Sequence, residues 1–522
     1  MRAAVRSHRE HAVRCRLALI VLLGSLVLPR VALAEAPKPL AITDLVTLRQ
    51  LDAGDAAHPG YGIGRMLDPA VARAAPIGSD ALFALPAMAG IRSAIDAEFA
   101  RFVVGHSVGE VGVGPSHAVQ LFDRAALDSG ATRFVLAGIV SRMDRAFVAP
   151  RTCGEVRLLY RLVRFDGAAA PARLPMTLNL VLNARSAADT AIDCAEIARR
   201  WLAVIDLPVG SADLAARLTA PDGALALVAP DHIDRIEINV QIAHTPESEA
   251  RDFRTHYLQK VFRLDAQTGK FEPAPLENQI DRDRILADDG LRRAFREWLL
   301  DPQHLAELDR GTLLIPEQFL ATASVAATPV GLARSSLQPA FGLMASDQAG
   351  AKAVFTENDV VAALQAADAH GIALQNIRSP AGFERRLNDI SCGGCHQIRA
   401  IGGFHFPGAD TSTAQPHAAN VPASPHFVGD QPRRRDIAVA MRDGRTPDFS
   451  RGFSDRPQAR RSAVLAGSEY FDGWGATCFQ PGTKAAERDM SFASWTCAKG
   501  LSCQPVGAEA SSRLGMCFVG TK

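Results

Sequence analysis

Residues 133–271 contain several runs in which apolar and polar side chains alternate, separated by turns instead of by repeated helices. Alternation with a period of two is typical of a strand with one buried face, and residues 233–242 alternate almost without a break. Strands joined by short turns favour a mainly antiparallel sheet over a doubly wound one. The expected strands are residues 133–145, 156–165, 174–182 and 233–242, followed by a hairpin of 257–264 and 270–271 with glycine in its turn.

Helical spacing of apolar residues predicts helices beside this sheet, which gives an α+β fold class. The expected helices are residues 194–205, 291–300, 302–308 and 358–369, the last with Thr356 as its N-cap. The composition, 48% hydrophobic and 22% charged, is that of a globular protein and excludes the disordered class.

The first 34 residues have the layout of a secretory signal. Five arginines between residues 2 and 16 precede an apolar run at 17–28, and Ala32-Leu33-Ala34 offers a cleavage site before Glu35. The alternative is an uncleaved anchor helix, for which the run is short. We therefore expect a periplasmic or secreted protein that does not span the membrane after cleavage.

The charge balance gives no reason to expect a nucleic-acid partner. Removal of residues 1–34 leaves 51 basic and 55 acidic residues, a formal charge of −4. Binding to nucleic acid would need a concentrated basic face.

Eight of the nine cysteines remain after residue 34, and an even number in an exported chain predicts paired or modified thiols. Cys153 and Cys194 are expected to form a disulfide, with Cα atoms roughly 4.4–6.8 Å apart. The tail, residues 461–522, is expected to be a small module held by two bridges, because so short a segment buries little core. Its cysteines are Cys478, Cys497, Cys503 and Cys517, for which three connectivities are open and zinc binding is the minor alternative.

The strongest local motif is Cys392-Gly393-Gly394-Cys395-His396, the C-x-x-C-H pattern of c-type haem attachment. On a helical turn, cysteines three positions apart project to the same side, and the preceding residues 381–391 can supply that helix. The sequence resembles c-type cytochromes over these five residues alone.

The resemblance implies covalent haem c, with thioethers from Cys392 and Cys395 and with His396 as the proximal iron ligand. Three other interpretations stay open. The two cysteines form a disulfide or redox pair, they bind zinc with His396 and His405, or they are inert.

The distal iron ligand is expected downstream of the motif. His405 lies in a glycine- and phenylalanine-rich stretch, and Met441 lies in the short apolar run 437–441. His417 and His426 are further candidates, and an open iron position is also possible. A lone methionine in an apolar run is more often a core residue.

Residues 402–457 are rich in Pro, Gly, His and Arg and have little periodicity, but they contain Phe404, Phe406, Phe427, Phe449 and Phe453. A flexible linker is one interpretation. Because disordered segments are poor in aromatic residues, we expect instead an ordered stretch, poor in regular structure, that packs back over residues 392–396.

These patterns predict a signal at residues 1–34, an α+β body at 35–345, a haem c segment at 346–460 and the cysteine-rich module at 461–522. The leading hypothesis is an exported monohaem c-type protein that transfers single electrons or binds a small ligand at iron, with an unknown redox partner. The alternative is a haem-free secreted binding or structural protein stapled by four disulfides. No zinc-protease helix or phosphate-binding loop is present, and the sequence analysis assigns no catalytic residue.

Overall fold

The computed structural model describes residues 40–55, 58–68, 76–165, 167, 171–188, 191–208, 210–211, 213–245, 254–328, 353–394 and 430–452, with tail pieces 477–479, 496–497, 501–505 and 514–519. The expected signal, residues 1–34, lies outside this part of the chain. Within these ranges, none of the helices has the length and apolar character that a membrane span requires.

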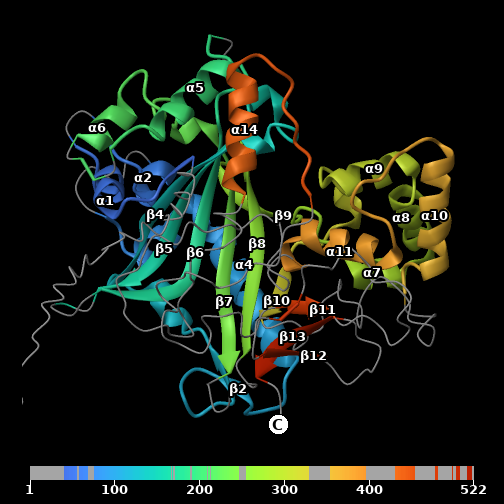
Figure 1. Cartoon of the computed structure of the whole chain (residues 1–522). Coiled ribbons are helices and arrows are strands. Elements are labelled where there is room, and N and C mark those ends of the chain that lie inside the picture. The colour runs from blue at the N-terminus through green and yellow to red at the C-terminus, as the bar shows by residue number, and fades with distance from the viewer. Residues whose placement is uncertain are drawn as a thin grey trace, which may run out of the picture. The chain divides into compact units, whose positions relative to one another are not determined.

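The chain has an α+β fold organised around one ten-stranded, mainly antiparallel sheet (Figure 1). Seven strands follow the order β1-β4-β5-β6-β7-β3-β2, and β8 pairs with β7, β9 and β10. Only the short β2–β3 pair among the described strands is parallel. The strands are β1 (Ala41–Ile42), β2 (Val111–Gly112), β3 (Val119–Leu121), β4 (Thr132–Arg142), β5 (Glu155–Arg164), β6 (Ala172–Asn183), β7 (Ile233–Thr245), β8 (Arg254–Asp265), β9 (Lys270–Ala274) and β10 (Ser324–Thr328).

The strands predicted from alternation are confirmed as β4 to β9. The β8–β9 hairpin turns through Gly269, whose φ of +67° is a conformation that glycine adopts without strain. The predicted strand 133–145 is too long, because residues 143–145 form a 3-10 turn after β4. Residues 324–328 were not expected to be a strand, yet they pair with β8 as β10.

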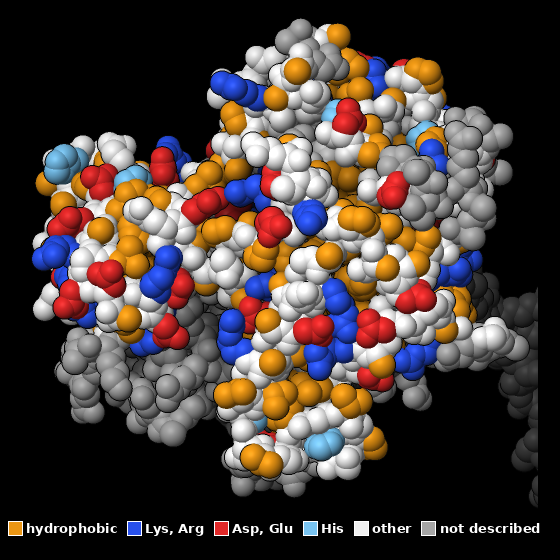
Figure 2. Space-filling view, turned by 180° about the vertical axis from the view of Figure 1, so that it is seen from behind, with side chains coloured by type: hydrophobic (Ala, Val, Ile, Leu, Met, Phe, Trp, Pro, Cys, Tyr) orange, Lys and Arg blue, Asp and Glu red, His pale blue; other side chains and the backbone are white. Residues whose placement is uncertain are grey.

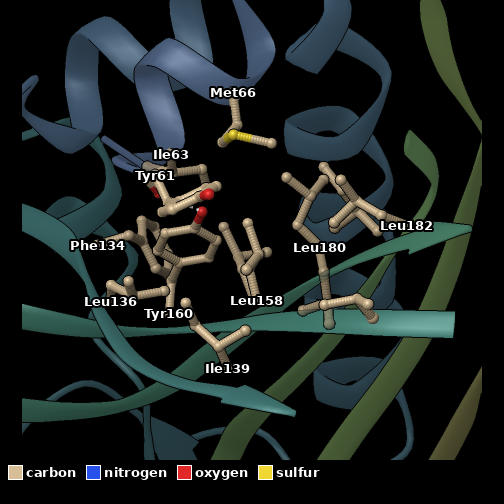
Figure 3. Close-up of a cluster of buried hydrophobic side chains, with 14 of the residues drawn as sticks. Tyr61, Ile63, Met66, Phe134, Leu136, Ile139, Leu158, Tyr160, Leu180 and Leu182 are labelled. Carbon is tan, nitrogen blue, oxygen red and sulfur yellow. Dashed lines mark hydrogen bonds between the residues drawn. The ribbon is translucent and has the colours of Figure 1, made fainter. Parts of the chain in front are cut away.

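One face of the sheet carries the main hydrophobic core (Figure 3). Leu158, Tyr160 and Leu180 project from β5 and β6 into this core and are fully buried. The Tyr160 hydroxyl donates to the carbonyl of Tyr61 at 2.6 Å, which ties the sheet to the segment before α2. The helices that cover this face or lie beside it are α1 (Leu45–Ala53), α2 (Ile63–Leu67), α3 (Ser79–Ala84), α4 (Ala89–Val104), α5 (Cys194–Val204) and α6 (Leu214–Thr219).

A second hydrophobic cluster is built mainly from five helices, drawn yellow to orange in Figure 1. Thr356 caps α10 as expected and forms a reciprocal capping box with Asp359. The cluster joins residues from Ile280 to Leu387, so its core extends across the expected boundary at 345. The five helices are α7 (Arg282–Ala287), α8 (Asp289–Leu299), α9 (Pro302–Arg310), α10 (Glu357–Ala369) and α11 (Pro380–Ile390).

The expectation that residues 402–457 are poor in regular structure is wrong for residues 431–442. Residues Gln431–Arg442 form helix α14, which packs against α5 (Figure 1). Pro432 lies in its first turn, where the missing proline N–H costs no helical hydrogen bond. Residues 395–429 lie outside the described part of the chain.

The disulfide predicted between Cys153 and Cys194 is confirmed, with Cα atoms 5.3 Å apart. It links the turn before β5 to the start of α5.

The tail contains a three-stranded antiparallel sheet of β11 (Thr477–Phe479), β13 (Leu514–Val519) and β12 (Leu501–Pro505). Cys478 pairs with Cys503, and Cys497 is also disulfide-bonded. Three cysteine sulfurs lie within 4.8 Å of one another, but as disulfides they are not thiolate ligands for zinc. The side chain of Cys517 is outside the described set.

Candidate functional site

The second face of the large sheet is polar and yet buried. Arg157, Asn179, Glu237, Gln241 and Gln259 project from β5 to β8, and each is at most 5% exposed. The strand register places them together. Asn179 lies opposite Glu237, and Gln259 lies opposite Asn239, between Glu237 and Gln241. The alternation at 233–242 predicted a half-buried strand, but both faces of β7 are covered. A buried polar face is informative because its groups cost stability unless they find hydrogen-bond or ion-pair partners.

Several amides on this polar face have buried atoms with no hydrogen-bond partner. They are the Asn179 Oδ1 and both side-chain polar atoms of Gln241 and Gln259. An unmade hydrogen bond at a buried group costs about 1–3 kcal/mol. Such groups call for water, an ion or a ligand beside them.

A cavity of about 400 Å³ opens along the same face, near the ends of β4, β5 and β7. Its wall is charged on the sheet side and apolar where Leu313, Ile315 and Ile390 contribute. The space-filling view from behind shows basic and acidic side chains mixed among apolar ones, without a broad basic patch among the described residues visible there (Figure 2). The charged groups on the cavity wall are Arg142, Arg145, Glu155, Arg157, Asp234, Arg235, Glu237, Arg263, Glu277, Glu317 and Arg451.

Cys392 borders this cavity and is buried. The expected helix before the motif is α11, and residues 392–394 are again helical after a break at Ser391. Cys392 belongs to a small apolar cluster on the polar face that includes Val140, Leu159 and Val261. Its thiol donates to the backbone carbonyl of Glu277, with sulfur and oxygen 3.7 Å apart. The first cysteine of the motif therefore lies against the sheet and beside the cavity.

The two glycines of the motif are required by close packing. A Cβ atom on Gly393 would lie 2.7 Å from the Ser324 hydroxyl, and one on Gly394 would lie 2.4 Å from the Asn388 carbonyl. The backbone N–H of Gly393 also donates to the Gln279 side chain at 2.8 Å. Glycine at both positions lets the turn lie close to β10 on one side and to α11 on the other.

A network of ion pairs forms the charged floor of the cavity. Arg157 and Arg235 each contact both Glu155 and Glu237, at 2.9–3.1 Å. Burial disfavours the charged form of Glu155, but Arg235 and Arg157 outweigh it and hold the pKa of Glu155 well below its ordinary value. Arg145 makes a two-pronged pair with Glu277. These carboxylates are thus charged partners of arginines and are poorly suited to general acid or base catalysis.

A second group of charges adjoins the cavity at its α14 end. The fully buried carboxylate of Asp144 contacts Arg142 at 2.8 Å, Arg433 at 3.1 Å and Arg451 at 3.2 Å. Arg434 lies 3.9 Å away. Of these, Arg142 and Arg451 border the cavity itself.

Of the residues predicted to attach the haem or ligate its iron, only Cys392 and Met441 lie in the part of the chain that the structure describes. Cys395, His396 and His405 lie outside the described residues. Met441 lies on α14 and packs against the main hydrophobic core, the setting of a structural methionine. No described contact brings Cys392 and Met441 together.

The described end of the expected wrapping segment does reach the cavity. Phe449 packs against Phe147, a wall residue, with ring centroids 5.7 Å apart. Arg386 of α11 donates to the Arg451 carbonyl at 2.8 Å, which fixes Arg451 at the cavity. Phe404, Phe406, Phe427 and Phe453 are outside the described residues.

Sequence reasoning missed the arginine and glutamate network altogether. The available signal was the run of charged residues on one face of β5 and β7, at positions 155, 157, 235 and 237. Such residues normally indicate a solvated face, and only the fold reveals that this one is covered.

Comparison of the chain with family models, curated proteins and solved structures gives no match.

Proposed function

We propose that the chain is an exported monohaem c-type protein that transfers single electrons or binds a small ligand at haem iron. The observation that carries this proposal is the position of Cys392, the first cysteine of the C-x-x-C-H motif, at the wall of a cavity of about 400 Å³. A motif that arose by chance would have no reason to face a cavity.

The cavity wall suits an amphipathic group. A haem needs apolar contacts for its ring, and Leu313, Ile315 and Ile390 offer them. It also carries two carboxylates, for which the cavity arginines are suitable partners. The orphaned amide atoms of Gln241 and Gln259 lie on the same sheet face but do not line the cavity. The wall is more polar than the apolar cavity that a haem site leads one to expect, and this is a correction to that expectation.

In this proposal Cys392 and Cys395 hold the haem through thioethers, and His396 ligates the iron. The haem would supply reversible one-electron chemistry or an open coordination position. His405 is the first candidate for the distal ligand and Met441 the second. Helix α11 and the glycines of the motif would position the attachment turn against the sheet.

The disulfides support export, because they form and persist in oxidising compartments. We accordingly place the protein in the periplasm or outside the cell. An electron-transfer role requires a redox partner, which we leave unassigned.

A second candidate is a haem-free exported binding protein stapled by four disulfides. The observation that favours it is the charged cavity wall, with six arginines and five acidic residues. Such a wall can bind a polar ligand without a cofactor.

The deciding experiment is the haem spectrum of the denatured protein, produced in a host with cytochrome c maturation. We expect covalent haem in the wild type and none after Cys392→Ala with Cys395→Ala. A matched control, Cys478→Ala with Cys503→Ala, removes a tail disulfide and should keep the haem. Absence of covalent haem from the wild type under these conditions would leave the haem-free candidate.

The distal ligand is tested by two single substitutions in the haem-loaded protein. His405→Ala should change the visible spectrum or the affinity for an added iron ligand, whereas Met441→Ala should not. The reverse result would assign the iron ligand to Met441.

A further inference from the structure

Exposed hydrophobic side chains gather in one loop of the described part of the chain. Seven large hydrophobic side chains are exposed there, and four of them, Val103, Val104, Val108 and Val113, lie between the last turn of α4 and the start of β3. Val104 is 85% exposed and Val108 is fully exposed. Exposed hydrophobic residues that occur singly are ordinary, but a group of them marks an interaction surface. Residues 103–118 are called the valine loop below.

The valine loop is almost uncharged. Between Arg101 and Asp123, Glu110 is the only Asp, Glu, Lys or Arg, although 22% of the whole chain is charged. The Glu110 carboxylate accepts from the backbone N–H of Ser107 at 3.0 Å, which holds this one charge against the loop's own backbone. Because a charged group is costly to transfer from water to an apolar environment, the scarcity of charge suits a loop that enters one.

The backbone of the valine loop forms hydrogen bonds within the loop and with β3. The N–H of His106 donates to the Val103 carbonyl at 3.1 Å, and the N–H of Glu110 donates to the Ser107 carbonyl at 3.1 Å. The N–H of Val119 donates to the Glu110 carbonyl at 3.0 Å, beside the pairing of β2 with β3. Backbone groups that leave water must find partners inside the protein, and the loop meets this condition at these positions.

One histidine holds the valine loop in shape. The ring of His117 lies against Gly112, where a Cβ atom would overlap it, and its Nδ1 atom lies 3.2 Å from the Gly109 carbonyl oxygen. Gly109 and Gly114 turn the chain with φ of +81° and +95°, and a Cβ atom at either would meet nothing within 4 Å. The turns of the loop therefore point into open space.

The valine loop lies at one end of the large sheet. Figure 1 shows β2 at the lower end of the view, where β7 ends and β8 begins, and Gln120 of β3 pairs with His244 of β7 there. Figure 2 shows the same end from behind, with apolar side chains gathered and few charged ones among them. The exposed valines thus belong to a projecting loop and not to a groove.

The loop also contains Gly105-His106-Ser107-Val108-Gly109, the spacing of a hydrolase nucleophile elbow. That elbow joins a strand to a helix that follows it. Here the order is reversed, because helix α4 precedes the turn and strand β2 follows it. The segment is therefore interpreted as a turn, and its valines are the feature that needs an explanation.

We propose that the valine loop inserts into the surface of a lipid bilayer and holds the chain there as a peripheral protein. Projecting aliphatic side chains, scarce charge and a hydrogen-bonded backbone suit the boundary between lipid headgroups and acyl chains. Arg101, one helical turn before Val104, has a side chain that is 73% exposed and can meet lipid phosphates.

The composition of the loop favours lipid over a protein partner. The centres of protein–protein interfaces are enriched in aromatic residues, Met and Arg. Residues 103–118 contain no Phe, Trp, Tyr, Met or Arg. The inference does not depend on haem attachment, so a chain with or without haem should behave alike.

The test is flotation of the full chain, purified after export, with phosphatidylcholine vesicles. We expect the wild type to float with the vesicles. Val104→Ser with Val108→Ser should lower its partition coefficient about tenfold or more, because two valine side chains no longer gain by leaving water. The matched control is Val46→Ser, which changes an exposed valine of α1 outside the loop and should leave binding unchanged. Val108→Trp should bind more tightly, since tryptophan favours the membrane interface.

Salt and vesicle composition separate insertion from attraction between charges. Binding to neutral phosphatidylcholine that persists at high salt supports insertion. Binding only to vesicles that contain phosphatidylglycerol, with loss at high salt, would overturn the proposal, as would equal binding of the wild type and the double variant. Sedimentation without lipid tests the remaining occupant. Self-association that the double variant loses, in a chain that does not bind vesicles, would assign the loop to a second copy of the chain and overturn the proposal.

Discussion

The two faces of the large sheet are both covered but differ completely in chemistry. On one face Leu158, Tyr160 and Leu180 pack into a continuous apolar core. On the other face, Arg157, next to Leu158 in sequence, belongs to the charged network. Asn179, next to Leu180, belongs to the row of amides whose buried atoms lack hydrogen-bond partners. The apolar face explains why the chain folds. The buried groups of the polar face cost stability unless a partner satisfies them, and it is the face against which Cys392 lies.

The comparison predicts its largest effect at Asp144 and the four arginines around it, Arg142, Arg433, Arg434 and Arg451. Asp144→Asn would leave four guanidinium groups close together without their central carboxylate. Breaking a buried ion pair from one side costs about 3–5 kcal/mol. Urea unfolding should show a loss of that size. A loss below about 1 kcal/mol would mean that the cluster is hydrated and that the polar face is not a buried site.

On the apolar face, Leu180→Ala should reduce the free energy of unfolding by about 2–5 kcal/mol. Leu180 is fully buried, and its truncation leaves a cavity in the main core. The substitution should leave covalent haem content unchanged in folded protein. A selective loss of haem with unchanged stability would contradict the division of roles between the faces.

The pH dependence of stability should have two parts, one from carboxyl groups with raised pKa values and one from carboxyl groups with lowered pKa values. Burial raises the pKa of Asp52 and of Asp389 to about 6, so the folded chain binds these protons more tightly than the unfolded chain. Stability should therefore rise by about 3 kcal/mol, roughly 1.4 kcal/mol for each group, as pH falls from 8 to 5. Glu155, Asp144 and Asp430 have pKa values held low by arginines, and their contribution should be lost below about pH 4.

Urea unfolding between pH 3 and pH 8 checks both parts of this profile. Asp52→Asn and Asp389→Asn should each reduce the rise between pH 8 and pH 5 and leave the acid limb in place. A flat profile above pH 5 in the wild type would show that neither carboxyl group has a raised pKa.

The smallest expected effect is a gain of stability on the polar face. Asn179 and Leu180 are neighbours in sequence on opposite faces, so Asn179→Leu is the counterpart of Leu180→Ala. It replaces a buried amide whose oxygen lacks a partner and should stabilise the chain by about 1 kcal/mol. Chemical unfolding measures this directly. A loss of more than 1 kcal/mol would show that the amide already has a partner, such as ordered water.

Much of the fold followed from local pattern in the sequence. Alternation located β4 to β9, and helical spacing with the Thr356 cap located α10. Helix α14 was missed because it begins Gln-Pro-Arg-Arg-Arg-Asp, which suggests a solvated segment. Arg434 is instead buried and Arg433 half-buried, both beside Asp144, almost 300 positions earlier. A local sequence pattern cannot predict an ion pair between residues so far apart in the chain.

In the candidate site, too, local features were predicted from the sequence and long-range contacts were not. The motif at Cys392 and the disulfide between Cys153 and Cys194 were visible from residue type and spacing. The cavity was not, because strands β4 to β8, helix α11 and Arg451 come together only in the folded chain. Its charged wall also could not be told from an exposed strand face by alternation alone.

The central claim, that the turn at Cys392 attaches a haem to the polar side of the sheet, is tested most directly by peptide mass spectrometry. Tryptic cleavage after Arg386 and Arg399 would release residues 387–399, which contain both cysteines of the motif. Protein from a host with cytochrome c maturation should give this peptide with one haem added through both cysteines. The same peptide found without haem, with Cys392 and Cys395 joined as a disulfide or left as thiols, would contradict the account.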